Sequence, residues 1–183
     1  PLRALVNSAG GGWAQRTIGK DGEFASAHDL NAYKKVIEIN LIGTFDCIRL
    51  AATAMSRLEP TETGERGAIV NMTSVAAFDG QIGQAAYSSS KGGVVGLTLP
   101  VARDLAAVGI RVNTVAPGLI DTPIYGTGEH AEAFKAKLGQ SVLFPHRLGK
   151  PEELASMVIE LITNSYMNAE VVRVDGGIRM PPK

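Results

Sequence analysis

The chain has 183 residues, of which 45% are hydrophobic and 20% are charged. Basic and acidic residues both number 18, so the net charge is zero, which argues against a nucleic-acid-binding or anionic-membrane-binding protein. A single cysteine, Cys47, excludes an internal disulfide, and no apolar run approaches the roughly 18 residues of a membrane span. We therefore expect a cytoplasmic protein, or one of an organelle matrix, that binds neither nucleic acid nor membrane.

The first half of the chain predicts one short strand and one long helix. The strand covers residues 4–7 and is followed by Gly10–Gly12, which we interpret as a flexible turn. Trp13 and Phe24 follow in a loop, where we expect them to pack. Apolar residues spaced at three or four predict a helix over residues 29–58.

The second half alternates strands with helices. Strands are predicted over 68–72, 110–115 and 171–174, and helices over 85–107, 130–138 and 151–163. Pro100 is expected to kink the first of these helices, and Pro151 marks the start of the last. This order predicts an α/β fold with a Rossmann-like, doubly wound parallel sheet that has helices on both faces.

Small polar residues follow three of the predicted strands. They are Asn7–Gly10, Asn71–Ser74 and the pair Pro117 and Gly118. In open α/β sheets the ligand lies at the carboxyl ends of the strands. The sequence therefore predicts a ligand site at this edge of the sheet.

Tyr87 and Lys91 provide the sharpest chemical signal. Residues four apart on a helix lie on one face, one turn apart. A nearby ammonium favours the phenolate form of a tyrosine, which can then exchange a proton with an alcohol or carbonyl oxygen. Ser74, thirteen residues before Tyr87, could hydrogen-bond that oxygen, and Asn40 is a polar residue inside an apolar helix that needs partners if it is buried.

Together these residues resemble the ordered motifs of the short-chain dehydrogenase/reductase family. The matching segments are Asn7-Ser8-Ala9-Gly10, Asn40 with Gly43 and Phe45, Ser74, Tyr87 with Lys91, Ala116-Pro117-Gly118 and Val174-Asp175-Gly176-Gly177. The likeness runs from the first residues to the last, and it is strongest to members that act on 3-hydroxyacyl-CoA.

The resemblance implies a role for each residue of the motif. Tyr87 would be the acid/base, and Lys91 would bind the nicotinamide ribose and favour the phenolate. Ser74 would orient the substrate oxygen, and Asn40 would hold a water molecule that links Lys91 to solvent. The resemblance also implies NAD as cofactor, with NADP possible. The cofactor would contact Asn7, Ala9, Gly10, Thr73, Tyr87, Lys91, Pro117, Gly118, Leu119 and Thr122.

The substrate side is less defined. Gln81 and Gln84 could contact substrate or simply cap a loop, and residues 122–150 are expected to form a substrate lid. We expect no metal site, because the three histidines are scattered without ligand spacing. The small-molecule substrate would be an acyl-CoA or another secondary alcohol or ketone.

The resemblance also implies the organisation of the whole chain. Residues 1–183 would be the C-terminal catalytic part of one dehydrogenase domain, with the N-terminal βαβαβ nucleotide half missing. The segment that decides between NAD and NADP would lie in that half. A homotetramer is expected, with helices 29–58 and 85–107 packing across a dimer interface.

Three functions stay open at this point. The first is an NAD-dependent dehydrogenase of 3-hydroxyacyl-CoA or a related secondary alcohol. The second is an NADPH-dependent 3-oxoacyl-carrier-protein reductase. The third is a non-catalytic assembly or binding subunit, although such a protein would have no chemical need for Asn40, Ser74, Tyr87 and Lys91 together.

Overall fold

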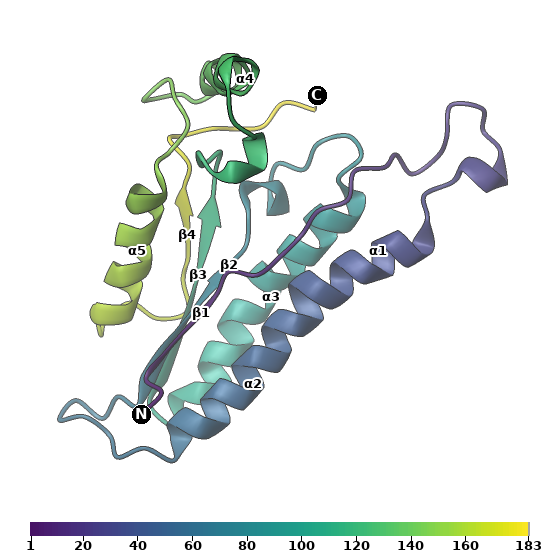
Figure 1. The fold of residues 1–183 in the computed structure, drawn as a ribbon. Coiled ribbons are helices and arrows are strands. Elements are labelled where there is room, and N and C mark those ends of the chain that lie inside the picture. Colours follow the sequence, from purple (N-terminus) through teal and green to yellow (C-terminus); the bar gives the residue numbers. More distant parts are fainter. Residues whose placement is uncertain (183) are drawn as a thin grey trace.

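A computed structural model describes residues 1–182 and contains one parallel sheet (Figure 1). Its strands are β1 (Ala4–Asn7), β2 (Gly67–Met72), β3 (Ile110–Pro117) and β4 (Val171–Val174). They lie side by side in chain order, and every neighbouring pair is parallel. Parallel neighbours need a crossover connection, which helices supply here. The predicted α/β fold with a parallel sheet is confirmed.

Helices cover both faces of this sheet (Figure 1). On one face lie α1 (Leu30–Ile37), α2 (Gly43–Ser56) and α3 (Ala85–Ala106), and on the other lies α5 (Pro151–Thr163). A further helix, α4 (Glu129–Gly139), stands beyond the carboxyl ends of the strands. Short 3-10 turns are η1 (Phe24–Ser26), η3 (Val75–Ala77) and η4 (Pro123–Tyr125). Within residues 1–182, no helix is both long and apolar enough to cross a membrane.

The long helix predicted over residues 29–58 differs in one respect. A π-helical turn, η2 (Glu38–Ile42), separates α1 from α2. A single π turn inside an α-helix often marks a functional position, and Asn40 lies in this one. The predicted long helix is present over residues 30–56, and the structure adds a π-helical turn at the residue with the most unusual side chain.

Alternation along β2 divides the apolar core between the two faces. Ile69 packs with Ile48 and Met55 beneath α2 and α3, whereas Val70 packs with Leu161 beneath α5. Successive strand residues point to opposite faces, so one short run of apolar residues anchors both helical layers. Each fully buried side chain of this kind contributes about 1.5–3 kcal/mol. The strand ends are thereby fixed at one edge.

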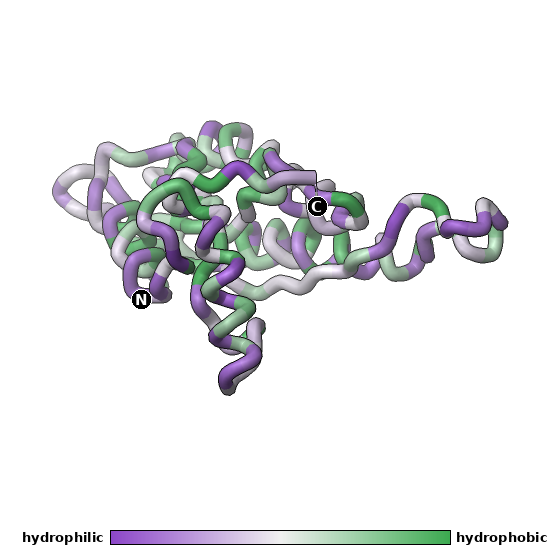
Figure 2. The backbone as a smooth tube through the Cα atoms, turned by 90° about the horizontal axis from the view of Figure 1, so that it is seen from above, coloured by the Kyte–Doolittle hydropathy of each residue, from purple (hydrophilic) through white to green (hydrophobic). Residues whose placement is uncertain are grey.

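An arm between Gly12 and Asp29 projects from the body of the molecule, and both views show it at the right (Figures 1 and 2). Phe24, in the 3-10 turn η1 of this arm, is 100% exposed, so the expectation that it packs is wrong. No part of the chain over residues 1–182 covers it. The base of the arm is fixed to the body, because the Gln15 amide donates to the Gly83 carbonyl at 2.9 Å.

Candidate active site

Tyr87 and Lys91 lie one turn apart on α3, as their spacing predicts. The Lys91 Nζ atom is 5.9 Å from the centroid of the Tyr87 ring and donates a 2.9 Å hydrogen bond to the Met72 carbonyl at the end of β2. Lys91 is only 5% exposed, and this burial lowers the pKa of its ammonium. The lysine therefore fixes the helix face that carries Tyr87 to the carboxyl end of a central strand.

Thr73 and Ser74 lead away from the same strand end. The Thr73 amide donates to the Val115 carbonyl of β3 at 2.8 Å, and its hydroxyl donates to the Lys91 carbonyl at 2.7 Å. Ser74 caps η3 and accepts a 3.1 Å bond from the Ala76 amide. These bonds bring Ser74 to the edge at which Tyr87 and Lys91 lie, while its contact with substrate stays a prediction.

Asn40 is fully buried and joins three segments. Its Oδ1 accepts from the Gly11 amide at 2.9 Å, and its Nδ2 donates to the Gly11 carbonyl at 2.8 Å and to Ser90 Oγ at 2.9 Å. Ser90 Oγ in turn donates to the Tyr87 carbonyl at 2.7 Å. The side-chain amide thus links the end of β1 to the helix of Tyr87. That Asn40 holds a water molecule stays a prediction.

The glycines after β1 are held rather than free. Both backbone polar groups of Gly11 are bonded to Asn40, so the turn is anchored at its middle residue, while the flexibility of Gly10–Gly12 stays a prediction. A Cβ added at Gly10 would lie 3.4 Å from Lys91 Nζ, and one at Gly12 would lie 3.7 Å from the Tyr87 ring. The same Cβ at Gly10 would lie 3.1 Å from Asn40 Oδ1, so a side chain there would crowd Asn40 first. We call this stretch, Gly10–Gly12 beside Lys91 and Tyr87, the cradle.

The other predicted cofactor residues lie along the same edge. Asn7 Nδ2 donates to Asn71 Oδ1 at 2.8 Å, which ties the ends of β1 and β2, and Ala9 follows in the exposed stretch before the cradle. Asn71 Nδ2 is buried with no hydrogen-bond partner among residues 1–182. Of the remaining residues, Pro117 ends β3, and Gly118, Leu119 and Thr122 follow it. Three strand ends therefore meet, as the sequence predicts.

Gln81 and Gln84 are engaged in local contacts. The Gln81 amide donates to Gln84 Oε1 at 2.9 Å, and Gln81 Nε2 donates to the Pro181 carbonyl at 3.0 Å. Of the two alternatives from sequence, these bonds match the loop-capping one. Contact of either glutamine with substrate stays a prediction.

Residues 122–150 form a segment beyond this edge of the sheet, and hydrogen bonds join its two ends. The Asp121 amide donates to the Gly149 carbonyl at 2.8 Å, and the Gly149 amide donates to the Leu119 carbonyl at 2.9 Å. Within the segment, burial raises the pKa of Tyr125, and the nearby Tyr87 and Asp121 add to that shift. Tyr125 therefore lies near Tyr87.

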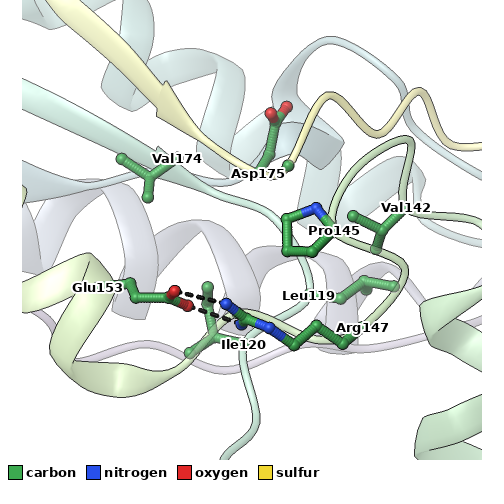
Figure 3. Close-up of a pocket in the computed structure, with 10 residues that line it drawn as sticks. Leu119, Ile120, Val142, Pro145, Arg147, Glu153, Val174 and Asp175 are labelled. Carbon is green, nitrogen blue, oxygen red and sulfur yellow. Dashed lines mark hydrogen bonds and ion pairs between the residues drawn. The ribbon is translucent and has the colours of Figure 1, made fainter.

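A cavity of about 240 Å³ lies where the two ends of this segment meet (Figure 3). Arg147 crosses it and donates from its two terminal nitrogens to the Glu153 carboxylate, at 2.8 and 2.6 Å. Glu153 also accepts from the Lys150 amide at 2.7 Å, which caps the start of α5. Leu119 lines the cavity, whereas Tyr87, Ser74 and Lys91 do not. The cavity therefore lies at the base of the segment rather than at the proton-transfer residues.

The Arg147 pair predicts a pH-dependent stability. Its hydrogen bonds lower the pKa of Glu153 from 4.5 to about 2. A carboxyl group with a lowered pKa stabilises the folded state above its ordinary pKa and loses that contribution as pH falls through the folded-state value. We expect Glu153→Gln to lower the melting temperature most above pH 4.5, with the difference from wild type shrinking toward pH 2. Glu152→Gln is the matched control, and a difference that does not vary with pH would contradict the assignment.

Sequence reasoning missed two features of this site. Ser90 is the link between Asn40 and Tyr87, but the two serines beside it in Tyr87-Ser88-Ser89-Ser90-Lys91 gave no sign of which would face inward. The cradle at Gly11 depends on Asn40, 29 residues away. Within the described residues, no three His, Cys, Asp or Glu side chains are grouped as metal ligands would be.

The chain matches known proteins over almost its whole length. A family model described as enoyl-(acyl carrier protein) reductase matches residues 1–179. A protein of Bos taurus named 3-hydroxyacyl-CoA dehydrogenase type-2 is 52% identical over 177 residues, which are 97% of this chain and 66% of the relative. A Rattus norvegicus protein named (3R)-3-hydroxyacyl-CoA dehydrogenase is 39% identical over 150 residues, which are 81% of this chain and 55% of the relative.

The fold has a close match among solved structures. The crystal structure of 3-hydroxyacyl-CoA dehydrogenase type-2 from Mycobacterium avium superposes with a TM-score of 0.91 at 46% identity, covering 99% of this chain and 68% of that one. The chain spans about two thirds of the length of the type-2 relatives that it matches. The structural agreement extends to the whole described sheet and its helices.

Proposed function

The chain belongs to the short-chain dehydrogenase/reductase family, and on this premise we propose that it is an oxidoreductase that interconverts a secondary alcohol and a ketone. The observation that carries the proposal is the placement of Tyr87 and Lys91 on one face of α3, beside the strand end that carries Ser74. The substrate that we propose is a 3-hydroxyacyl-CoA and its 3-oxoacyl-CoA product, because relatives about half identical carry that activity in their names.

The protein's own part in the reaction is orientation and proton transfer. Ser74 donates a hydrogen bond to the substrate oxygen. In oxidation the Tyr87 oxygen takes the hydroxyl proton while the carbon–oxygen bond becomes a carbonyl, and in reduction Tyr87 returns that proton. The Lys91 ammonium stabilises the Tyr87 phenolate, which is present before oxidation and after reduction. A nicotinamide cofactor, when bound, supplies the acceptor or donor of the hydride.

The cradle supports the proposal that the cofactor binds along this edge of the sheet. Gly10 and Gly12 leave room beside Lys91 and the Tyr87 ring, and the strand-end residues lie along the same edge. We propose that Asn7, Ala9 and Gly10 hold the adenosine side. At the other end, Thr73, Pro117, Gly118, Leu119 and Thr122 would hold the nicotinamide side. NAD is the cofactor that we propose, with NADP as the alternative.

An assay of the full-length protein separates the candidate functions. We expect acetoacetyl-CoA to be reduced with oxidation of NADH, followed by the absorbance of the reduced nicotinamide. Faster turnover of acetoacetyl-carrier-protein with NADPH would instead support the reductase that the matching family model describes. No turnover with either cofactor would contradict both enzyme functions and favour a binding subunit.

We also propose that residues 122–150 act as a substrate lid. One support is that backbone hydrogen bonds among Leu119, Asp121 and Gly149 join the two ends of the segment. The other is that Tyr125 lies near Tyr87. Ile124, Leu143 and Phe144 of this segment are exposed and could cover an apolar acyl chain. A lid closed over substrate would exclude water from the proton transfer.

The exposed apolar side chains of η2 and the start of α2 support the proposal of a homotetramer. Ile39, Ile42 and Phe45 are exposed apolar side chains in a row, and Phe45 is 50% exposed. Such a patch on a helical face favours contact with a second copy. We expect Phe45→Arg to reduce the mass measured by size-exclusion chromatography with light scattering, because it places a charge in that contact. Phe45→Leu should keep the wild-type mass, and an unchanged mass for Phe45→Arg would contradict this interface.

A further inference from the structure

The C-terminal segment (residues 175–182) lies against the loop that connects β2 to α3 (residues 73–84). The Ile82 amide donates to the Pro182 carbonyl at 3.0 Å, and Gln81 Nε2 donates to the Pro181 carbonyl at 3.0 Å. The β2–α3 loop begins directly after Met72, whose carbonyl accepts the hydrogen bond from Lys91. It carries Ser74 and leads into the helix of Tyr87. The chain's last described residues thus hold the loop on which the proposed chemistry depends. We call residues 173–182 the brace.

Arg173 is the centre of this brace. Its guanidinium donates to Asp79 Oδ2 at 2.7 Å, to Asp175 Oδ2 at 2.7 Å and to the Ile178 carbonyl at 2.9 Å. The Phe78 ring lies 5.4 Å from its central carbon, a cation–π distance. The side chains of Arg173 and Asp79 are both mostly buried, and the hydrogen bond from Arg173 lowers the pKa of Asp79. One arginine therefore holds both the loop and the C-terminal segment.

The same segment contacts the lid segment on its other side. The Phe144 amide donates to the Gly176 carbonyl at 3.0 Å. Ile178 is buried in a small cluster with Val75, the residue after Ser74, and Val142 of the lid segment. A Cβ added at Gly176 would come within 2.5 Å of a Val142 methyl, so the approach is possible only for glycine. The brace therefore has one contact surface for the Ser74 loop and another for the lid segment.

We propose that Arg173 is a positioning residue that holds, through Asp79, the β2–α3 loop where Ser74 meets the substrate oxygen, and that the C-terminal segment couples this loop to the lid segment. The proposal rests on the proposed function and deepens it. A displacement of about 1 Å in a catalytic group can lower turnover by roughly 100-fold, so a contact away from the reacting atoms can control the rate.

Asp79→Asn tests the positioning role, because it keeps the size of the side chain and removes its charge. We expect kcat for acetoacetyl-CoA to fall about 10-fold or more, measured well below the melting temperature. The KM for the nicotinamide cofactor should change little, and Asp79→Glu should restore most of kcat. Glu65→Gln is the matched control, because it breaks the 2.8 Å Arg111–Glu65 pair at the opposite edge of the sheet.

In that control we expect a lower melting temperature with kcat unchanged. If Asp79→Asn lowers the melting temperature to the same degree and also leaves kcat unchanged, Arg173 and Asp79 only stabilise the fold and the positioning role is wrong.

Hydrogen exchange tests the coupling without any need for turnover. The Ile82 amide reports the loop contact and the Phe144 amide reports the lid-segment contact. We expect Asp79→Asn to speed exchange at both amides, and Glu65→Gln to speed it at neither. Unchanged exchange at both in Asp79→Asn would overturn the brace, and faster exchange at Ile82 alone would overturn the coupling. A wild-type protein without turnover would refute the proposed function but leave this test decisive.

Discussion

Tyr87→Phe should lower turnover by about 100- to 10,000-fold while leaving the fold intact. The substitution removes only the hydroxyl that exchanges a proton with the substrate oxygen. The ring that lies 5.9 Å from Lys91 Nζ and beneath Gly12 remains. Steady-state kinetics of the reduction of acetoacetyl-CoA would measure the loss, and an unchanged melting temperature would show that the fold has survived.

Tyr125 is the rival phenol, because it lies near Tyr87. Burial raises the pKa of Tyr125, which disfavours its phenolate and makes its hydroxyl a weaker acid. Tyr125→Phe should therefore cost far less turnover than Tyr87→Phe, and Tyr166→Phe, on a fully solvent-exposed side chain, should cost nothing. Near-normal turnover in Tyr87→Phe with a large loss in Tyr125→Phe would assign the acid/base to the lid segment instead.

Elements with local signals could be predicted from the sequence to within one or two residues. The helix over 151–163 and the strand over 171–174 have the predicted bounds, because Pro151 sets the helix start and a short β-branched run sets the strand. Pro100 lies inside α3, as expected. The i,i+4 spacing of Tyr87 and Lys91 needs nothing beyond a helix to bring both to one face.

Features that depend on distant partners could not be predicted. The π turn at Glu38–Ile42 contains Asn40, whose bonds reach Gly11 and Ser90, 29 and 50 residues away. The turn at Gly10–Gly12 has no side chains that could indicate a partner, and its anchor is Asn40. Arg173 meets Asp79 across 94 residues, a distance over which charge alone gives no pairing rule. Local propensity therefore specified the scaffold, while long-range polar contacts specified the site.

Lys91→Met should separate catalysis from stability. We expect turnover to fall by more than about 100-fold, because the phenolate loses the nearby ammonium that stabilises it. The fold should survive, since methionine has a similar length and the lost hydrogen bond from the ammonium to the Met72 carbonyl is worth only about 1.5–3 kcal/mol. Lys91→Arg should not restore turnover, because a planar guanidinium does not reproduce the compact ammonium that donates to the Met72 carbonyl.

The pH dependence of unfolding gives Lys91→Met a second readout. Burial lowers the pKa of Lys91 below its ordinary 10.5, so in the window between the folded-state pKa and 10.5 the unfolded chain binds the additional proton. Stability attributable to this lysine therefore rises with pH through that window, and the rise should be absent in Lys91→Met. Lys137→Met, on an exposed lysine of α4, should keep both the rise and the turnover. A Lys91→Met variant with wild-type turnover would remove the lysine from the mechanism, and one that keeps the pH-dependent rise would show that the buried ammonium is not its source.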